Sequence, residues 1–277
     1  MRNEIFSIVT CSYQQGRFLE ATIRSVLDQN HPYLEYIVLD GGSTDESVEI
    51  LRRYDDAISY WHSECDAGQT DALARGIDRA SGEYIGWLCS DDLLLPGALQ
   101  IVSDFFESHP EVQAVYGDAL WIDAQGEFLR PKKEIQFNRF IFHYDHNYIP
   151  QPSMFWRREL YQKVGGLNRR FNLAMDADLW DRFAQVTSIA HIPQYLSCMR
   201  FYPEQKTRSM RSEGAREDDE IRARSALAKY PSAQSWLRHL ARLQRRLLRL
   251  AGGAYFERVP PQLLDGLARY RIVGERS

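Results

Sequence analysis

The sequence predicts an α/β fold with a mostly parallel sheet flanked by helices, followed by a C-terminal helical extension. Two observations support this class. Strand patterns alternate with helix patterns through the first half of the chain, which is typical of a parallel sheet covered by helices. In addition, the 277 residues are 44% hydrophobic, enough to bury the core of one large domain and leave an appendage.

The first half contains four strand patterns separated by helical ones. We expect the strands at residues 5–10, 36–39, 58–61 and 84–88. Between them, apolar residues recur at helical spacing. Ser43 and Glu46 have the spacing of a capping box before one helix, and Asp66 and Gln69 can cap the next.

The second half is less regular. Strands are expected at residues 112–116 and 119–122, and a helix from about Asp176. Residues 126–150 show no clear period, and so long a stretch in a compact domain is usually a functional loop or a lid. Within it, His143 and His146 can be interpreted as a metal pair, although three-residue spacing outside a helix often arises by chance.

Several protein classes are excluded by what the sequence lacks. No run reaches the roughly 18 apolar residues of a spanning helix, and the first residues enter a strand pattern directly, so no secretory signal is expected. Four scattered cysteines favour a reducing cytoplasm over a zinc site or disulfide framework. No Gly-x-Gly-x-x-Gly or Walker loop is present, which argues against NAD enzymes and nucleoside triphosphatases.

Charge is distributed unevenly. The net charge is −4, yet residues 221–256 hold eight basic residues and no acidic one, so the remainder carries −12. Within residues 236–250, Trp236 and four leucines form a stripe among five arginines, the pattern of an interfacial helix on an anionic membrane surface. The alternative is a helix packed on the main domain or against another subunit, with its arginines in solvent.

Polar residues gather where the strand patterns end, at residues 10–13, 40–43, 66–69 and 90–92. Ligands of open α/β sheets bind outside the carboxyl ends of the strands, so these endings predict one pocket edge. Asp91 and Asp92 are the most informative members. Two adjacent carboxylates repel each other and lose hydration, and a divalent cation relieves both costs. Alternatively, they are acidic residues placed before the helix that begins near Pro96.

Six segments carry a family resemblance when taken in order. They are Ser-Ile-Val-Thr-Cys-Ser-Tyr at 7–13, Ser-Val-Leu-Asp-Gln at 25–29, Asp-Gly-Gly-Ser-Thr-Asp at 40–45, the run 68–76, Ser-Asp-Asp at 90–92, and Met-Asp-Ala-Asp-Leu-Trp at 175–180. In this order and spacing the chain resembles the inverting family-2 glycosyltransferases, of the kind acting in bacterial cell-surface polysaccharide assembly. The resemblance covers about residues 5–200 and implies the GT-A-type, Rossmann-like fold.

The resemblance implies a nucleotide-sugar site with a cation beside it. Asp40 is expected to accept from a uracil ring N–H, and Tyr13 to stack on the base. Asp91, with Asp92 beside it, is expected to hold Mg²⁺ or Mn²⁺ against the diphosphate, where the cation acts as a Lewis acid for the leaving group. The residues implied to bind the nucleotide sugar are Thr10, Cys11, Ser12, Tyr13, Asp40, Gly68, Gln69, Asp71, Ser90 and Asp91.

A base must take the proton of the attacking acceptor hydroxyl. The resemblance implies Asp176 for this role, with Asp178 as its rival. On a helix, residues two apart point about 200° from one another, so both cannot face one pocket. Asp178 lies four residues before Arg182, a spacing that suits a surface ion pair. The alternative for Asp176 is a helix-start carboxylate without a catalytic role.

On the acceptor side, the resemblance implies Gln151, Trp156 and Trp180, and a place in the core is the alternative for the two tryptophans. The chain departs from the family pattern at three positions. Gly41 stands where a second acid is frequent, Cys89 stands where an acid often precedes the metal motif, and no histidine follows Arg200. The predicted metal site therefore depends on the Asp91–Asp92 pair.

The predicted function is that of an inverting glycosyltransferase of the hexosyltransferase type. It would move a sugar from a nucleotide-diphosphate donor, UDP-linked by expectation, to a hydroxyl of a glycan or lipid-linked acceptor. We expect a catalytic domain over 1–205, with a donor half (1–117) and an acceptor half (118–205), and an extension over 206–277. The expected location is cytoplasmic, at the inner face of the plasma membrane if the basic helix binds lipid, without a nucleic-acid partner. A sugar nucleotidyltransferase and a non-enzymatic nucleotide-sugar- or glycan-binding scaffold are the alternatives.

Overall fold

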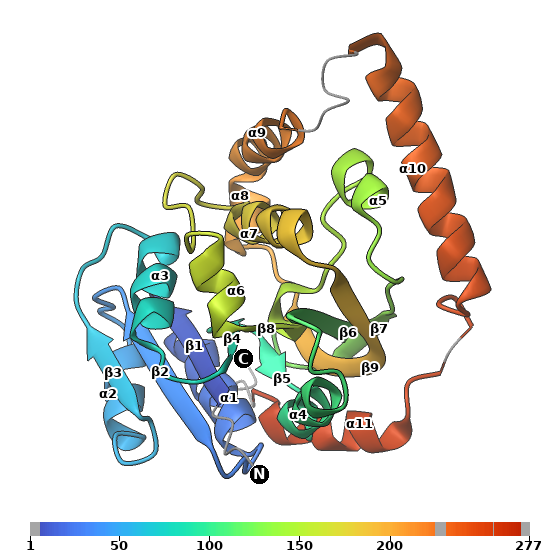
Figure 1. Cartoon of the computed structure of the whole chain (residues 1–277). Helices are drawn as coiled ribbons and strands as arrows, with labels where there is room; N and C mark the ends of the chain where they lie inside the picture. The colour runs from blue at the N-terminus through green and yellow to red at the C-terminus, as the bar shows by residue number, and fades with distance from the viewer. Residues whose placement is uncertain (1–5, 225–230, 257, 273–277) are drawn as a thin grey trace.

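A single sheet forms the centre of the computed structural model, which describes residues 6–224, 231–256 and 258–272 (Figure 1). The strand order is β3-β2-β1-β4-β8-β6-β9-β5, and β7 pairs with β6. The strands are β1 (Phe6–Ser12), β2 (Leu34–Asp40), β3 (Tyr60–Ser63), β4 (Tyr84–Cys89), β5 (Leu93–Leu94), β6 (Ala114–Ile122), β7 (Phe128–Lys132), β8 (Met154–Arg157) and β9 (Ile189–Arg200).

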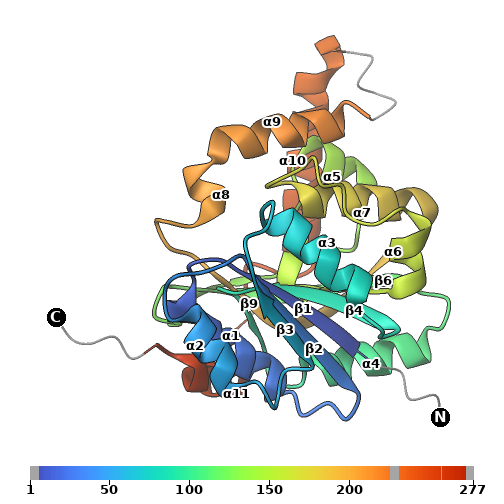
Figure 2. The ribbon, with the colours of Figure 1, turned by 90° about the vertical axis from the view of Figure 1, so that its left-hand side faces the viewer.

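Helices cover both faces of the sheet, as Figure 2 shows for α3 on one side of β1 and β2 and α1 and α2 on the other. The helices are α1 (Gly16–Leu27), α2 (Ser47–Arg53), α3 (Gln69–Arg79), α4 (Ala98–Ser108), α5 (Arg139–Tyr144), α6 (Arg158–Lys163), α7 (Met175–Val186), α8 (Lys206–Ser209), α9 (Arg211–Arg222), α10 (Pro231–Ala251) and α11 (Pro261–Leu267), with 3₁₀ turns η1 (Gln151–Ser153) and η3 (Ala268–Tyr270).

Alternation along β1 divides the core into two layers. Phe6 and Ile8 join the cluster under α1 and α2, whereas Val9 and Cys11 join the cluster under α3 and α7. The second layer is tight, because a Cβ atom on Gly76 of α3 would lie 2.5 Å from Val9 Cγ1. All of β1 is buried, and exposed residues follow directly at its carboxyl end.

The predicted α/β class is confirmed, and all four strands expected in the first half are present. The pairs β1–β2, β1–β4 and β2–β3 are parallel. The second half of the sheet is mixed, since β8 is antiparallel to both β4 and β6 while β9 is parallel to β6. Residue 5, included in the first predicted strand, lies outside the described residues.

Three local predictions were wrong. The strands expected at 112–116 and 119–122 form one strand, β6, whose register against β9 shifts around Gly117 and Asp118. The stretch 126–150 contains β7 and α5, so it is not a single loop. The Ser43–Glu46 capping box does not form: Asp45 Oδ1 accepts from the Ser47 amide at the start of α2, and the Ser43 hydroxyl donates to Asp40.

The C-terminal segment returns to the main body. Leu267 and Tyr270 pack with Leu93, Leu95 and Leu120 in a third apolar cluster. The helix α10, which precedes this segment in the sequence, lies along α5 at the edge of the molecule (Figure 1). Among the described residues, no helix is both long and apolar enough to cross a membrane. The predicted division into residues 1–205 and 206–277 stays a prediction.

Candidate functional site

The carboxyl ends of three parallel strands meet at one edge of the sheet. The register pairs Ser12 of β1 with Asp40 of β2, and Cys11 of β1 with Cys89 of β4. Polar residues that lie about 30 and 50 positions apart in the sequence therefore come together, as expected for a ligand pocket of an open α/β sheet.

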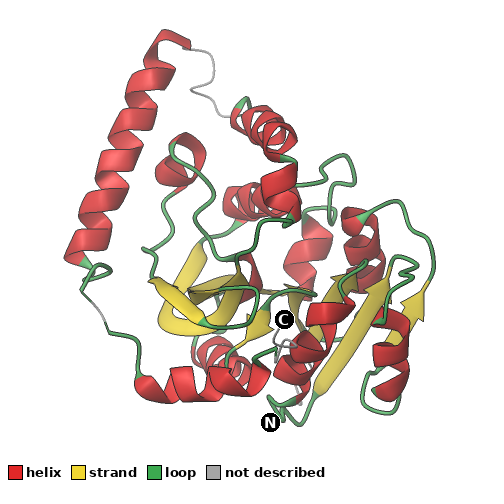
Figure 3. Cartoon of the chain, turned by 180° about the vertical axis from the view of Figure 1, so that it is seen from behind, coloured by secondary structure: helices red, strands yellow, loops and turns green. Residues whose placement is uncertain are grey.

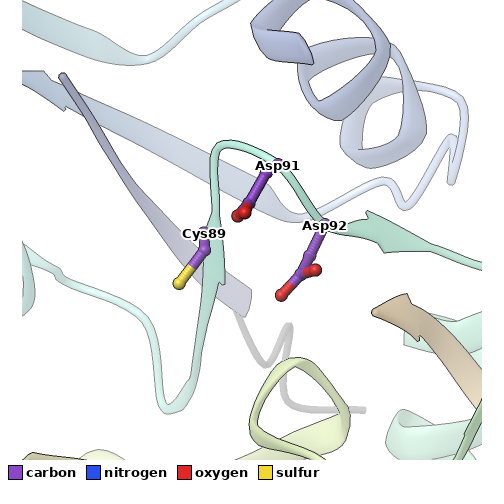
Figure 4. Close-up of side chains that lie close together, drawn as sticks. All are labelled: Cys89, Asp91 and Asp92. Carbon is purple, nitrogen blue, oxygen red and sulfur yellow. The ribbon is translucent and has the colours of Figure 1, made fainter. Parts of the chain in front are cut away.

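Asp91 and Asp92 lie on the turn between β4 and β5 (Figure 4). Together with Cys89 they form a group whose potential ligand atoms all lie within 4.8 Å of one another. Asp92 is buried and Asp91 is half-buried. Burial raises the pKa of the Asp91 carboxyl, and burial together with the charge of Asp91 raises the pKa of Asp92 well above its usual range. The two carboxylates on this turn thus lose hydration and repel each other, as the sequence predicted.

The turn is held from behind by buried polar contacts. Arg200 is fully buried, its amide donates to Asp92 Oδ1 at 2.9 Å, and its Nε donates to the Asp91 carbonyl at 2.8 Å. Thr22 of α1 donates its hydroxyl to the carbonyls of Ser90 and Asp92. Arg200 binds one carboxylate oxygen of Asp92 but the backbone carbonyl of Asp91, so these contacts fix the turn and leave carboxylate oxygens for a ligand.

The residues present fit a hard divalent cation. Tyr202 donates to Asp91 Oδ2 at 2.8 Å and Arg200 to Asp92 Oδ1, which leaves one carboxylate oxygen on each aspartate for a metal. Oxygen ligands from one or two carboxylates suit Mg²⁺ and Mn²⁺, whereas the Cys89 thiol is a soft ligand that these ions disfavour. The unused oxygens of Asp91 and Asp92 are thus the candidate ligands.

Tyr13 and Asp40 lie at the ends of β1 and β2, where the nucleoside was predicted. The Tyr13 side chain is 62% exposed and free to stack on a base. Asp40 is buried, and its carboxylate accepts from the Ser43 amide, the Ser43 hydroxyl and the Ser63 hydroxyl at 2.8, 2.6 and 2.7 Å. A carboxylate offers about four acceptor positions, so one remains for a base N–H.

The predictions for the β1 side chains need correction. Thr10 is fully buried and its hydroxyl accepts from Tyr36 at 3.1 Å, on the face of the sheet that carries α1. This hydroxyl is therefore not available to a nucleoside, and a contact through the Thr10 backbone stays a prediction. Cys11 and Ser12 are buried as well, although the Ser12 hydroxyl finds no hydrogen-bond partner in the described structure. Successive residues of β1 point to opposite faces of the sheet, and both faces are covered, so side chains within the strand are buried whichever way they point.

The residues at the start of α3 lie at the same edge of the sheet, next to Cys89. Gly68 has a φ of 107°, which favours glycine, and it precedes the first turn of α3. Gln69 donates to Cys89 Sγ at 3.4 Å and accepts from Lys206 Nζ at 3.2 Å. Asp71 forms an ion pair with Arg169 at 3.0 Å. Ser90 is buried within the turn that carries Asp91 and Asp92.

Asp176 lies in the first turn of α7 and has the properties of a base. Its pKa is raised to about 6, mainly because burial disfavours the charged form, and the nearby Asp218 adds to the effect. Asn147 donates to Asp176 Oδ2 at 2.9 Å, and the Ala177 amide donates to Oδ1 at 2.7 Å. A carboxylate with a pKa near the working pH is suited to general base catalysis.

Asp178 occupies a different environment from the one the sequence predicted. It does pair with Arg182, at 2.7 Å, but it is fully buried, so the predicted surface ion pair was wrong. Its other oxygen pairs with Arg224 of the segment after α9. Asp178 is fully buried and two guanidinium groups bind its oxygens, so it lies out of reach of an acceptor hydroxyl, and the geometry favours Asp176 over this rival.

Of the three residues predicted on the acceptor side, the two tryptophans take the alternative place in the core. Trp156 and Trp180 are fully buried and pack on each other and on Trp87 and Phe183. Trp156 lies on β8, an interior strand of the sheet, and Trp180 lies on α7, which covers that part of the sheet. Gln151 remains half-buried beside the pocket, and its side chain donates to the Trp87 carbonyl at 2.9 Å.

His143 and His146 do not form a metal pair. His143 Nε2 lies 2.9 Å from Asp181, whereas His146 Nδ1 lies 3.1 Å from Asp145, so the two rings contact different carboxylates. Both of these neighbours also pair with arginines, Arg139 with Asp181 and Arg242 with Asp145.

Several residues near the site gave no sequence signal. Tyr202 stands close to where the family's histidine is expected, and its phenol reaches Asp91. Lys206 links Gln69 to Asn172 and thereby connects the donor pocket to the loop before α7. Asn147 belongs to the stretch without a period. The absence of the histidine after Arg200 could have directed attention to Tyr202.

Comparison with known sequences agrees with this geometry. Residues 7–165 match the family model of glycosyl transferase family 2. An uncharacterized glycosyltransferase of Mycobacterium tuberculosis is 30% identical over 182 residues, or 65% of this chain and 69% of that protein. A PGL/p-HBAD biosynthesis glycosyltransferase of Mycobacterium bovis is 28% identical over 200 residues, or 69% and 76% of the two chains. An uncharacterized glycosyltransferase of Rickettsia conorii is 27% identical over 215 residues, 74% of this chain but 35% of its own length.

Solved structures show the same fold. S. aureus TarS 1–349 in complex with UDP-GlcNAc matches with a TM-score of 0.64 and 16% identity, covering 96% of this chain and 80% of that one. A mannosyltransferase from Pyrobaculum calidifontis in complex with GDP-Man and Mn²⁺ matches with a TM-score of 0.56 and 16% identity, covering 96% and 70%. Because the family model spans more than half of the chain, including β1–β4 and the carboxylate turn, the chain belongs to glycosyl transferase family 2 and is a glycosyltransferase.

Proposed function

We propose that the chain transfers a sugar, with inversion, from a UDP-sugar to a hydroxyl of a glycan or lipid-linked acceptor. The observation that carries the proposal is the pair of desolvated carboxylates, Asp91 and Asp92, at the strand ends that also carry Tyr13 and Asp40. The likeness to structures bound to UDP-GlcNAc, and to GDP-Man with Mn²⁺, supports a nucleotide-sugar donor and a divalent cation.

Each part of the site would have a separate task. The base would stack on Tyr13 and donate its ring N–H to Asp40. Asp91 and Asp92 would hold Mg²⁺ or Mn²⁺, which neutralises charge on the diphosphate when bound. Gln151, half-buried next to Cys89, would face the sugar or the acceptor.

Asp176 would take the acceptor proton. The acceptor oxygen forms its bond to the anomeric carbon as the bond to the diphosphate breaks, and the hydroxyl proton passes to the carboxylate. Attack from the face opposite the diphosphate inverts the anomeric configuration. Hydrogen bonds connect the segment of Asp176 to the strand ends: Lys206 bridges Gln69 and Asn172, and Asn172 lies just before α7.

We also propose the cellular setting from the sequence and the relatives. A relative named for PGL/p-HBAD biosynthesis supports a role in glycan or glycolipid assembly. The chain would act in the cytoplasm on an acceptor carried at the inner face of the plasma membrane, with residues 1–205 as the catalytic domain.

The first test measures sugar transfer from a panel of UDP-sugars and from GDP-mannose, with Mn²⁺ and after its removal by a chelator. We expect transfer from a UDP-sugar that requires the metal, and a product whose anomeric configuration is opposite to that of the donor. Asp91→Asn should lower the rate about a hundredfold or more and weaken Mn²⁺ binding measured by calorimetry.

Asp55→Asn, which changes an exposed aspartate remote from the carboxylate turn, is the control and should leave both quantities unchanged. Full activity of Asp91→Asn, or transfer that proceeds equally well without a metal, would contradict the proposed role of the carboxylate pair.

A further inference from the structure

The helix α10 directs its apolar side chains away from the protein. Trp236, Leu240, Leu243, Leu247 and Leu250 are 65, 37, 48, 57 and 51% exposed, and we call these five residues the outer stripe. At about 100° per residue they fall within about 80° of one another around the helix axis. Tyr255 and Phe256, 53 and 76% exposed, follow at its C-terminal end.

The opposite face of α10 is polar and bound to the body. Arg245, about 180° from Trp236, donates to both oxygens of the buried Glu134 at 2.9 Å. Arg242 and Arg245 also pair with Asp145. The alternative interpretation of the sequence, a packed helix with its arginines in solvent, does not hold for Arg245, which pairs with the body. Acidic groups on the body select the arginine face, and the apolar face is turned outward.

The outer stripe lies on the edge of the molecule. Figures 1 and 3 show α10 at the periphery from opposite directions, with α5 as its neighbour. Monomeric proteins rarely expose a continuous row of large apolar side chains, and such a row marks a surface that another apolar body covers. The ionic contacts hold the helix in this orientation.

The charges around the stripe identify what covers it. His239 and Arg246 flank it and are exposed, and residues 221–256 contain no acidic residue. A second copy would bring the same cations together without a carboxylate from this segment to pair with them. Anionic headgroups accept arginines that flank an inserted apolar face.

We propose that the outer stripe, with Tyr255 and Phe256, is a docking surface that inserts into the headgroup region of an anionic lipid bilayer. Arg246 binds lipid phosphates there, while Arg245 and Glu134 keep the helix fixed on the enzyme. The proposal goes beyond the sugar transfer and can be tested without measuring it.

The same contacts lead from the docking surface to the acceptor side of the site. Asp145 binds the two arginines of α10, and Asn147, two residues later, donates to Asp176. A bilayer under α10 would therefore place the headgroups of lipid-linked molecules near the loop that contacts the proposed base.

The test measures flotation of the full chain with phosphatidylcholine vesicles and with vesicles that also contain phosphatidylglycerol. We expect binding to the anionic vesicles and, in the same samples, a shift of Trp236 fluorescence to shorter wavelength that Trp236→Phe removes. Leu243→Ser with Leu247→Ser should weaken vesicle binding about tenfold or more, and Arg246→Gln should weaken it in a salt-dependent way.

Matched controls separate the surface from general effects. Leu129 of β7 is 48% exposed, the same fraction as Leu243, so Leu129→Ser should leave vesicle binding unchanged. Arg216 of α9 is exposed, and Arg216→Gln should have no effect. Equal binding by the stripe variants and the native chain would overturn the proposal. The proposal would also be overturned if a stripe substitution changed the molecular mass measured by sedimentation equilibrium but left vesicle binding unchanged. In that case a second copy of the chain would cover the outer stripe.

Discussion

The pKa of Asp176 links the environment of one side chain to the rate of the enzyme. Burial raises this pKa to about 6, and the Asn147 hydrogen bond acts in the opposite direction because it stabilises the charged form. If Asp176 is the base, only its ionised form can accept the proton. We therefore expect the rate of transfer to rise with pH through about 6 and then level off, as measured in a pH–rate profile.

Asn147→Ala should move that inflection to higher pH, so the rate falls most below the inflection and recovers above it. Asp176→Asn should lower the rate by about 10²- to 10⁴-fold above pH 6 and should remove the inflection. The control is Asn168→Ala, since the Asn168 side chain accepts from the backbone amide of Arg170 in its own turn. An inflection that stays in place in Asn147→Ala would show that another group controls the profile.

The sign of the stability effect is opposite to that of a salt-bridged aspartate. The folded chain binds the Asp176 proton more tightly than the unfolded chain does, because the folded pKa is the higher one. The contribution of this carboxyl to stability is therefore present at low pH and is lost as the pH rises through about 6. Stability is thus reduced in the pH range where a charged base is needed.

At the scale of elements, Glu217 of α9 positions the start of α7. Its carboxylate accepts from the amides of Asn172, Leu173 and Ala174 at 2.9, 2.8 and 2.8 Å, and the side chain is buried. These amides lie on the segment that enters α7, whose N-cap is Ala174, and a carboxylate near a helix N-terminus is also favoured by the helix dipole. One side chain from another helix thus fixes the segment that carries Asp176.

Glu217→Ala should lower the free energy of unfolding by about 3 kcal/mol, because it leaves three buried amides without an acceptor. Urea denaturation measures this quantity. Glu220 lies on the same helix as Glu217 and forms an exposed ion pair with Arg170. Glu220→Ala should change the free energy of unfolding by less than about 1 kcal/mol. Equal effects of the two substitutions would mean that α9 contributes only by its surface charge.

The sequence predicted the elements of the first half well because each has a strong local signal. Buried strands there are short apolar runs, and each ends in polar residues. In contrast, β8 and β9 are interior strands whose neighbours are far away in the sequence, and β9 carries polar residues such as Gln194 and His191. Local patterns cannot identify strands whose pairing depends on distant segments.

At the scale of the whole molecule, α10 is joined to the body by a buried ionic group. Glu134 pairs with Lys132 and Arg245, which hold the pKa of Glu134 low although burial opposes this. Arg245→Ala should lower the free energy of unfolding by about 2–3 kcal/mol, since it leaves a buried carboxylate with only one cation. The pKa of Glu134 is lower in the folded chain than in the unfolded chain. The contribution of Glu134 to stability is therefore lost as the pH falls through its folded pKa.

The adjacent arginine provides the comparison. Arg246 is exposed and has no ion pair in the described part of the chain, so Arg246→Ala should change stability by no more than about 0.5 kcal/mol. Both variants can be measured by urea denaturation. If Arg245→Ala is as stable as Arg246→Ala, the buried group does not hold α10 on the body.

The sequence by itself determined the α/β class, the carboxylate pair at the end of β4, the proposed base and the amphipathic character of α10. These follow from the residue types and their spacing along one segment. The tertiary structure decided which side chains remain available. It buried Thr10, Trp156, Trp180 and Asp178, and it turned Arg245 of α10 inward onto Glu134. Burial and ion pairing depend on residues brought together from distant parts of the chain, and such contacts leave no periodic trace in the sequence.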